Sequence, residues 1–127
     1  MIRAHWSAVM SLLSGVKAYE TRAPAGTAPP YVVIHPDQGT ATTTRFDTAS
    51  DWRNWSFQTD CVGTTVEQAQ WMAEKVEAAL LDKKPAVTGR VCGPIRSIVA
   101  RPMDRDEDVQ PPLFLARTLW AFPSLPN

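Results

Sequence analysis

The sequence has little of what catalysis, metal binding or membrane insertion requires. Its 127 residues include two histidines and two cysteines, and neither histidine stands at metal-ligand spacing from a cysteine. The six glycines are scattered, so no phosphate-binding loop, dinucleotide fingerprint or nucleophile elbow is present. No segment approaches the roughly 18 apolar residues of a membrane span. We therefore expect no catalytic residue, no metal site, no cofactor and no membrane contact.

The chain also lacks an excess of either charge. Thirteen basic and thirteen acidic residues give a formal net charge of zero. A protein that wraps nucleic acid needs a basic surface, and an RNA-binding sheet adds aromatic residues to it, so neither role is favoured. Hydrophobic residues make up 44% and charged residues 20%, which is typical of a folded globular protein. The length suits one domain, residues 1–127.

The two cysteines are far apart in sequence, so no disulfide framework is implied. Cys61 alternates with Trp55 and Phe57 and is expected to be a small buried hydrophobe. Cys92 precedes Gly93-Pro94 and is expected at a strand entry. These residues leave open whether the two cysteines pair, although the composition indicates synthesis in a reducing compartment.

Two helices are expected from the spacing of apolar residues. Ile2, Trp6, Val9 and Leu13 form one face of a short helix that ends near Gly15. Arg3 and His5 interrupt this apolar N-terminus and no clear cleavage site follows, so a helix is favoured over a secretory signal.

The second helix is the element with the clearest pattern. Thr64 with Glu67 makes a capping box, and Thr65 with Gln68 offers a second register. Pro85 stops the helix. Its apolar stripe consists of Val66, Ala69, Met72, Ala73, Val76, Ala79 and Leu80.

β-Branched and alternating runs predict strands between these helices and after them. They lie at Tyr31–His35, Asn54–Val62, Ile95–Arg101 and Leu113–Phe122, with a short one within Val16–Glu20 and a loose tail from Pro123. The fold class is α+β, an antiparallel or mixed β-sheet of about four strands with one long and one short helix packed on it. The expected core includes Tyr31, Val33, Trp55, Phe57, Met72, Val76, Ile98 and Leu119.

Two long non-periodic stretches are candidates for contacts with partners. Gln38–Trp52 is rich in threonine, and Pro102–Pro112 is acidic. The acidic stretch lacks the glycine and terminal glutamate of a calcium loop, so a solvated loop is expected. The candidate interface residues are Arg45, Trp52, Arg53, Trp71, Asp104, Asp106, Glu107 and Asp108.

The last predicted strand is apolar on both faces. It is either central and covered on both sides, or one side meets another subunit. One long and one short helix do not cover both faces of a sheet, so contact with another subunit is favoured.

Several of these segments together resemble the tail terminator proteins of long-tailed, siphovirus-type bacteriophages. The resemblance runs roughly from Pro29 to Phe122. It rests on Pro30-Tyr31-Val32-Val33-Ile34 after a Pro/Gly loop, a strand ending at Asp60, Thr64-Thr65-Val66-Glu67-Gln68-Ala69 at the start of a helix, and Asp106-Glu107-Asp108-Val109 before a strand with Thr118 and Trp120.

The resemblance implies a structural protein without catalysis. It implies a homohexameric ring, in the neck region of the virion, that caps the tail tube, stops its growth and meets a head–tail connector or stopper protein. Genomic DNA would pass through the lumen without sequence-specific binding, which suits a chain of zero net charge. The protein would be made in the host cytoplasm.

Two alternatives stay open at the level of sequence. One is another neck or head–tail connector protein of the same virion. The other is a small α+β ligand-binding or enzymatic domain, which a pocket lined by His35 and the cysteines would support.

Overall fold

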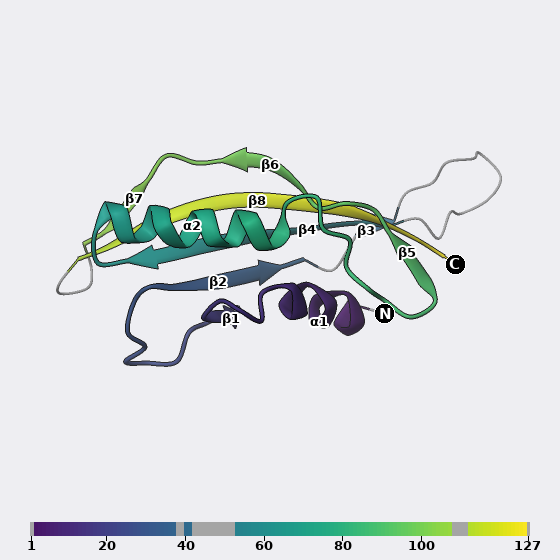
Figure 1. Ribbon diagram of the computed structural model, residues 1–127, viewed down its shortest axis with the longest axis horizontal. Coiled ribbons are helices and arrows are strands. Elements are labelled where there is room, and N and C mark those ends of the chain that lie inside the picture. The colour runs from purple at the N-terminus through teal and green to yellow at the C-terminus, as the bar shows by residue number, and fades with distance from the viewer. Residues whose placement is uncertain (1, 38–39, 42–52, 108–111, 127) are drawn as a thin grey trace.

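The computed structural model describes residues 2–37, 40–41, 53–107 and 112–126 (Figure 1). It has two helices, α1 (Ile2–Leu12) and α2 (Val66–Leu80). The strands are β1 (Ala18–Glu20), β2 (Tyr31–Pro36), β3 (Thr40–Ala41), β4 (Arg53–Gly63), β5 (Arg90–Cys92), β6 (Arg96–Ala100), β7 (Asp104–Asp106) and β8 (Leu113–Pro126). Within these ranges no helix is long and apolar enough to cross a membrane.

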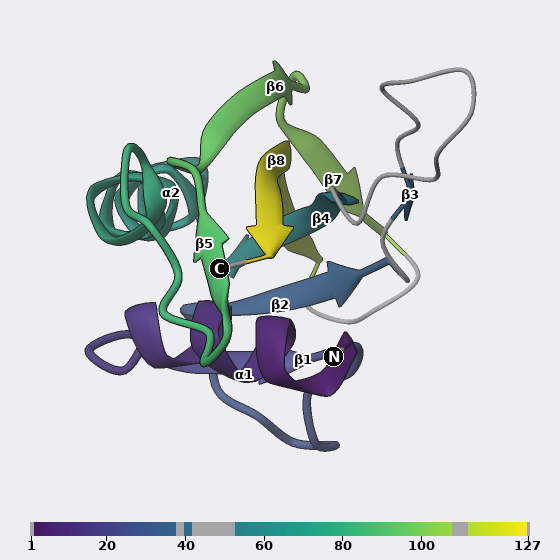
Figure 2. The same cartoon turned by 90° about the vertical axis from the view of Figure 1, so that its right-hand side faces the viewer.

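The strands form one mixed sheet in the order β1-β2-β4-β8-β5. β1 pairs with β2 in parallel, and the other pairs are antiparallel. β8 is central, because β4 occupies one of its edges and β5, β6 and β7 share the other. The sheet curls into a half-barrel (Figure 2). The predicted α+β class is confirmed, and the short strands bring the sheet above the four strands expected.

Both helices pack on one face of this sheet. Trp6 of α1 meets Trp55, Phe57 and Phe122 with edge-to-face ring contacts at 5.5–6.3 Å. Residues of α2 bury in the same cluster, among them Met72, Val76 and Leu80. Alternate side chains of β4 therefore face the helices, and the side chains between them face the other side of the sheet.

The end of β4 and the start of α2 are built by local hydrogen bonds. The N–H of Gln68 donates to Thr65 Oγ1 at 3.1 Å, and Gln68 Oε1 accepts from the Thr64 N–H at 2.7 Å. The Thr65 register of the cap is thus the one used. Only Thr64 and Thr65 separate β4 from α2, and this short connection holds the helix against its own strand.

Most of the predicted core is confirmed. Val33, Trp55, Phe57, Met72 and Val76 are buried, whereas Tyr31 and Leu119 are half-buried. The prediction that Ile98 is buried is wrong. This residue is 55% exposed, because β6 pairs only with β8 and no described helix covers it. The pattern of a β-branched run does not distinguish an edge strand from a central one.

Two predicted irregular segments contain strand. The tail was expected to be loose from Pro123, but β8 runs to Pro126 because Val91 and Cys92 pair with Leu125 and Ser124. The acidic stretch was expected to be a loop, yet Asp104–Asp106 forms β7 against β8. Both segments become strand because their backbones pair with another strand, which is distant in sequence for the tail and near in sequence for β7.

The N-terminal helix meets the C-terminal strand through a buried polar contact. The ring of His5 stacks on Trp55 with centroids 4.2 Å apart, and His5 Nε2 lies 2.8 Å from Ser124 Oγ. Of the expected apolar face of α1, Trp6, Val9 and Leu13 are buried and Ile2 is exposed. This contact joins the two ends of the chain.

Candidate interaction surface

The sequence-predicted interface residues do not form one cluster. Arg45, Trp52 and Asp108 lie outside the described residues. Arg53 is half-buried at the start of β4, and Trp71 stands on α2. Asp104 and Asp106 belong to β7, with Glu107 directly after it.

The acidic segment is largely neutralised by its own surroundings. Asp104 Oδ2 lies 3.2 Å from Arg117 Nη1, and Glu107 Oε1 lies 3.3 Å from Arg105 Nη1. Asp106 also takes part in an interaction of its own. Burial and the nearby charge of Asp106 raise the pKa of Tyr31. The charges of the acidic segment are therefore less available to a partner than the sequence implied.

A ladder of polar side chains crosses the sheet face opposite the helices. His35 of β2 lies 3.0 Å from Asp60 of β4, which Gln58 also contacts at 2.8 Å. Arg117 of β8 stands between Asp60, at 3.7 Å, and Asp104 of β7, at 3.2 Å. The ladder links four strands and leaves little free charge on this face.

This geometry speaks against the pocket that would favour a ligand-binding or enzymatic domain. Val32 pairs with Cys61 and His35 pairs with Gln58, so His35 and Cys61 point to opposite faces of the sheet. Both cysteines are buried and free, not bridged. Within the described residues, no group of three or more His, Cys, Asp or Glu side chains could hold a metal ion.

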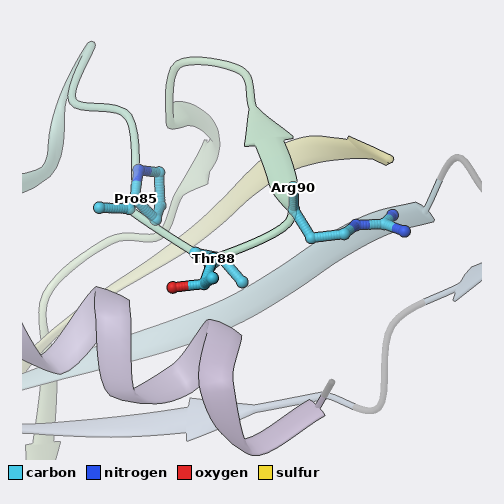
Figure 3. Close-up of a pocket in the computed structure, with 5 residues that line it drawn as sticks. Pro85, Thr88 and Arg90 are labelled. Carbon is cyan, nitrogen blue, oxygen red and sulfur yellow. The ribbon is translucent and has the colours of Figure 1, made fainter. Parts of the chain in front are cut away.

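A small surface pocket lies beside β5, lined by residues 85–88 and Arg90 (Figure 3). The Arg90 guanidinium donates to Ser124 Oγ at 3.0 Å and to the backbone carbonyl of Ser124 at 2.8 Å. Arg90 thus fixes the end of β8. This engagement gives the arginine a structural role there.

The exposed side of α2 combines an aromatic ring with carboxylates. Trp71 is 48% exposed, and Lys75 Nζ lies 4.8 Å from the centre of its ring. Glu67, Glu74 and Glu77 are exposed, and none has an ion-pair partner in the part of the chain that the structure describes. These glutamates were missed, although the spacing of Glu67 and Glu74 from Trp71, four and three residues, places them beside its ring on a helix.

A groove of about 410 Å³ separates α2 from β6. Ala73, Glu77 and Leu81 form the helix wall. The floor is β8, with Trp120 at its base, and Ser97, Ala100 and Arg101 line the far wall. Ile98 and Val99 of the same strand do not line the groove and are 55% and 43% exposed.

The exposed side of α2 therefore carries Trp71 with charges of both signs. Val99 belongs to a different surface, because it pairs with Leu119 on the sheet face opposite the helices. Large apolar side chains gathered on a surface mark contact sites in soluble proteins. Both surfaces can therefore contact a partner.

Comparison with known proteins identifies the family. Residues 4–110 match the model of the family described as Tail completion protein gp17, so the chain belongs to that family. The family is one of structural components of phage-like tails, which implies a role without catalysis. The resemblance to tail terminator proteins pointed to the same class of virion protein.

A solved structure has the same fold. It is a chain of the structure titled "Virion of native gene transfer agent (GTA) particle", with a TM-score of 0.65 and 14% sequence identity. The match covers 98% of this chain and 93% of that chain. The search of curated proteins gave no match.

Proposed function

We propose that this protein is a tail terminator: a homo-oligomeric ring, of six copies by family resemblance, at the head-proximal end of the tail tube. The ring stops tube growth and joins the tail to the head connector. The match of residues 4–110 to the tail completion family carries this proposal. In this proposal the protein is a structural component and not an enzyme.

The sheet face opposite the helices supports a role inside an assembly. Leu113, Leu115 and Leu119 are half-buried on this face of β8, beside the ladder that Arg117 completes. No helix of the described chain covers it. A half-apolar face of this kind suits a neighbouring protein in the neck.

The zero net charge supports passage of DNA through the ring. A channel that has to release DNA cannot hold it with many lysines, because each neutralised phosphate strengthens binding. Gln38–Trp52 and Pro102–Pro112 remain the proposed contact segments for the tail tube and the connector.

Imaging of particles made with and without this protein tests the proposal. Particles without it should carry tails of irregular length that are not joined to heads. Restoring the protein should restore uniform, joined tails, with a ring of its copies at the tail end. Tails of normal length that fail only to join heads would instead indicate a neighbouring connector protein.

A further inference from the structure

The outer side of β6 is an open edge of the sheet. β6 pairs with β8 on one side, and no described strand pairs with it on the other. All five of its residues are exposed, and Figure 2 shows β6 at one extreme of the molecule, with no other labelled element beyond it. An open edge presents backbone N–H and C=O groups with which a further extended chain can pair.

The register of β6 shows which of its backbone groups point outward. The N–H of Arg101 donates to the carbonyl of Arg117 at 2.9 Å, so the backbone groups of Arg101 point toward β8. In an antiparallel pair, the backbone groups of successive residues point to alternate sides of the strand. The N–H and C=O of Ala100, which lies opposite Thr118, therefore point away from β8. Neither group has a hydrogen-bond partner among the described residues.

Apolar side chains flank these outward-pointing groups. Ile98 and Val99 are 55% and 43% exposed, and they are the one pair of sequence neighbours among the exposed large hydrophobic residues of the described chain. Val99 lies on the sheet face opposite the helices, whereas Ala100 lines the groove beside α2. A strand laid along this edge would therefore meet apolar atoms on both of its faces.

The open edge is short and partly protected. A β-bulge between Ser97 and Val99 restricts its regular part to the residues that follow. Arginines stand at both ends, because Arg96 begins β6 and Arg101 follows it. Bulges and charged residues on edge strands reduce indiscriminate pairing, so this edge favours a specific occupant over general aggregation.

A second copy of the chain is a poor occupant. Antiparallel pairing of β6 with β6, in the register that overlaps the whole strand, would place Arg96 of each copy opposite Arg101 of the other. The opposite edge of the sheet, β1, has only three residues. The carbonyl of Glu20 in β1 already accepts the N–H of Arg22 at 2.7 Å. The occupant is therefore better sought in a different protein.

We propose that β6 binds an extended apolar segment of another protein of the particle, which adds a strand to the sheet and exchanges hydrogen bonds with Ala100. Pro102–Pro112, the segment proposed to contact the tail tube and the connector, directly continues this edge. The inference rests on the proposed place of the protein at the tail end, but it does not need the ring. DNA suits the edge less, because phosphates would not bury the side chains of Ile98 and Val99.

A proline at position 100 tests the backbone contact. Ala100→Pro removes an N–H that points away from β8, and proline is tolerated on edge strands at such positions. The variant should keep the fold and lose incorporation into tails about tenfold or more, because the hydrogen bond is lost and the ring blocks the approach of a strand. Ala100→Ser keeps the N–H and nearly the same size, so this control should incorporate normally. A Ala100→Pro protein with an unchanged thermal unfolding midpoint and normal incorporation overturns the inference.

Photo-cross-linking in assembled tails identifies the occupant, and it decides the question even if Ala100→Pro does not fold. Benzoylphenylalanine in place of Ile98 should form an adduct with a segment of another virion protein. The same photoreactive amino acid in place of Ile2, which is 45% exposed on α1, is the control and should not capture that segment. An adduct of position 98 with a second copy or with DNA overturns the inference. The absence of any adduct, or capture of one segment from both positions, also overturns it.

Imaging keeps this inference apart from the proposed function. Joined tails of uniform length with a ring, but without the adduct at position 98, contradict only the inference. The adduct in particles whose tail length does not depend on this protein contradicts only the terminator role.

Discussion

Burial decides the chemistry of the two cysteine side chains. Cys61 lies in the core between the sheet and the helices, where burial, with the adjacent Asp60 charge as a smaller cause, raises its pKa to about 12. Burial also raises the pKa of Cys92, and a hydrogen bond with Ser124 opposes this. Thiols in such surroundings behave as small hydrophobes and not as nucleophiles.

We predict that Cys61 does not react with a thiol reagent at pH 8 in the folded protein and reacts fully in denaturant. The folded pKa of about 12 exceeds the ordinary 9.0, so the unfolded chain ionises first. Stability from this thiol is therefore present below pH 9 and declines as pH rises toward 12. Time-resolved titration with Ellman's reagent measures it, with a Cys61→Ser variant to assign the signal. Fast labelling of Cys61 without denaturant would contradict the burial.

At the scale of elements, the passage from β4 to α2 depends on a close approach of backbones. A Cβ added at Gly63 would lie 2.5 Å from the backbone nitrogen of Ala69. No side chain can move away to relieve that contact. The glycine therefore allows the first turn of α2 to lie directly on the end of the strand that precedes it.

We predict that Gly63→Ala destabilises the fold by about 1–3 kcal/mol, because the backbone of α2 has to shift. Gly15→Ala is the matched control, since a Cβ there has open space around it. Its effect should stay within about 0.5 kcal/mol. Denaturant unfolding followed by circular dichroism compares the two. Equal stabilities would show that α2 does not rest on β4 in this way.

At the scale of the whole molecule, one arginine connects strands across the sheet. Arg117 stands between Asp60, whose side chain is 15% exposed, and Asp104 of β7. Its Nε is buried without a hydrogen-bond partner. The guanidinium thus holds two carboxylates of like charge near each other on a face that no described helix covers.

We predict that Arg117→Met costs about 1–2 kcal/mol, because Asp60 loses a counter-charge while half-buried. The value stays below that of a fully buried pair, since Arg117 is itself 36% exposed. Arg101→Met is the control: Arg101 is exposed and has no ion-pair partner among the described residues, so about 0.5 kcal/mol is its upper bound. Urea unfolding curves would measure both. Identical midpoints would mean that the ladder adds nothing.

The sequence alone determined both helices, the main strands, the α+β class and the kind of family. These features follow from local patterns, each of which spans only a few residues. The patterns are the 3.6-residue period of α2, the Thr65–Gln68 cap and the alternation of Trp55, Phe57 and Cys61. The positions of Val33, Met72 and Val76 in the core followed from the same periodicity.

Only the tertiary structure decided which apolar and charged groups remain available. Ile98 and Val33 stand in similar β-branched runs, yet β6 lies at an edge and β2 lies inside the sheet. Asp104 and Glu77 look alike in sequence, yet Arg117 pairs with the first, and no arginine or lysine of the described chain pairs with the second. Pairing partners and strand neighbours are set by contacts between distant residues, and no local pattern encodes them.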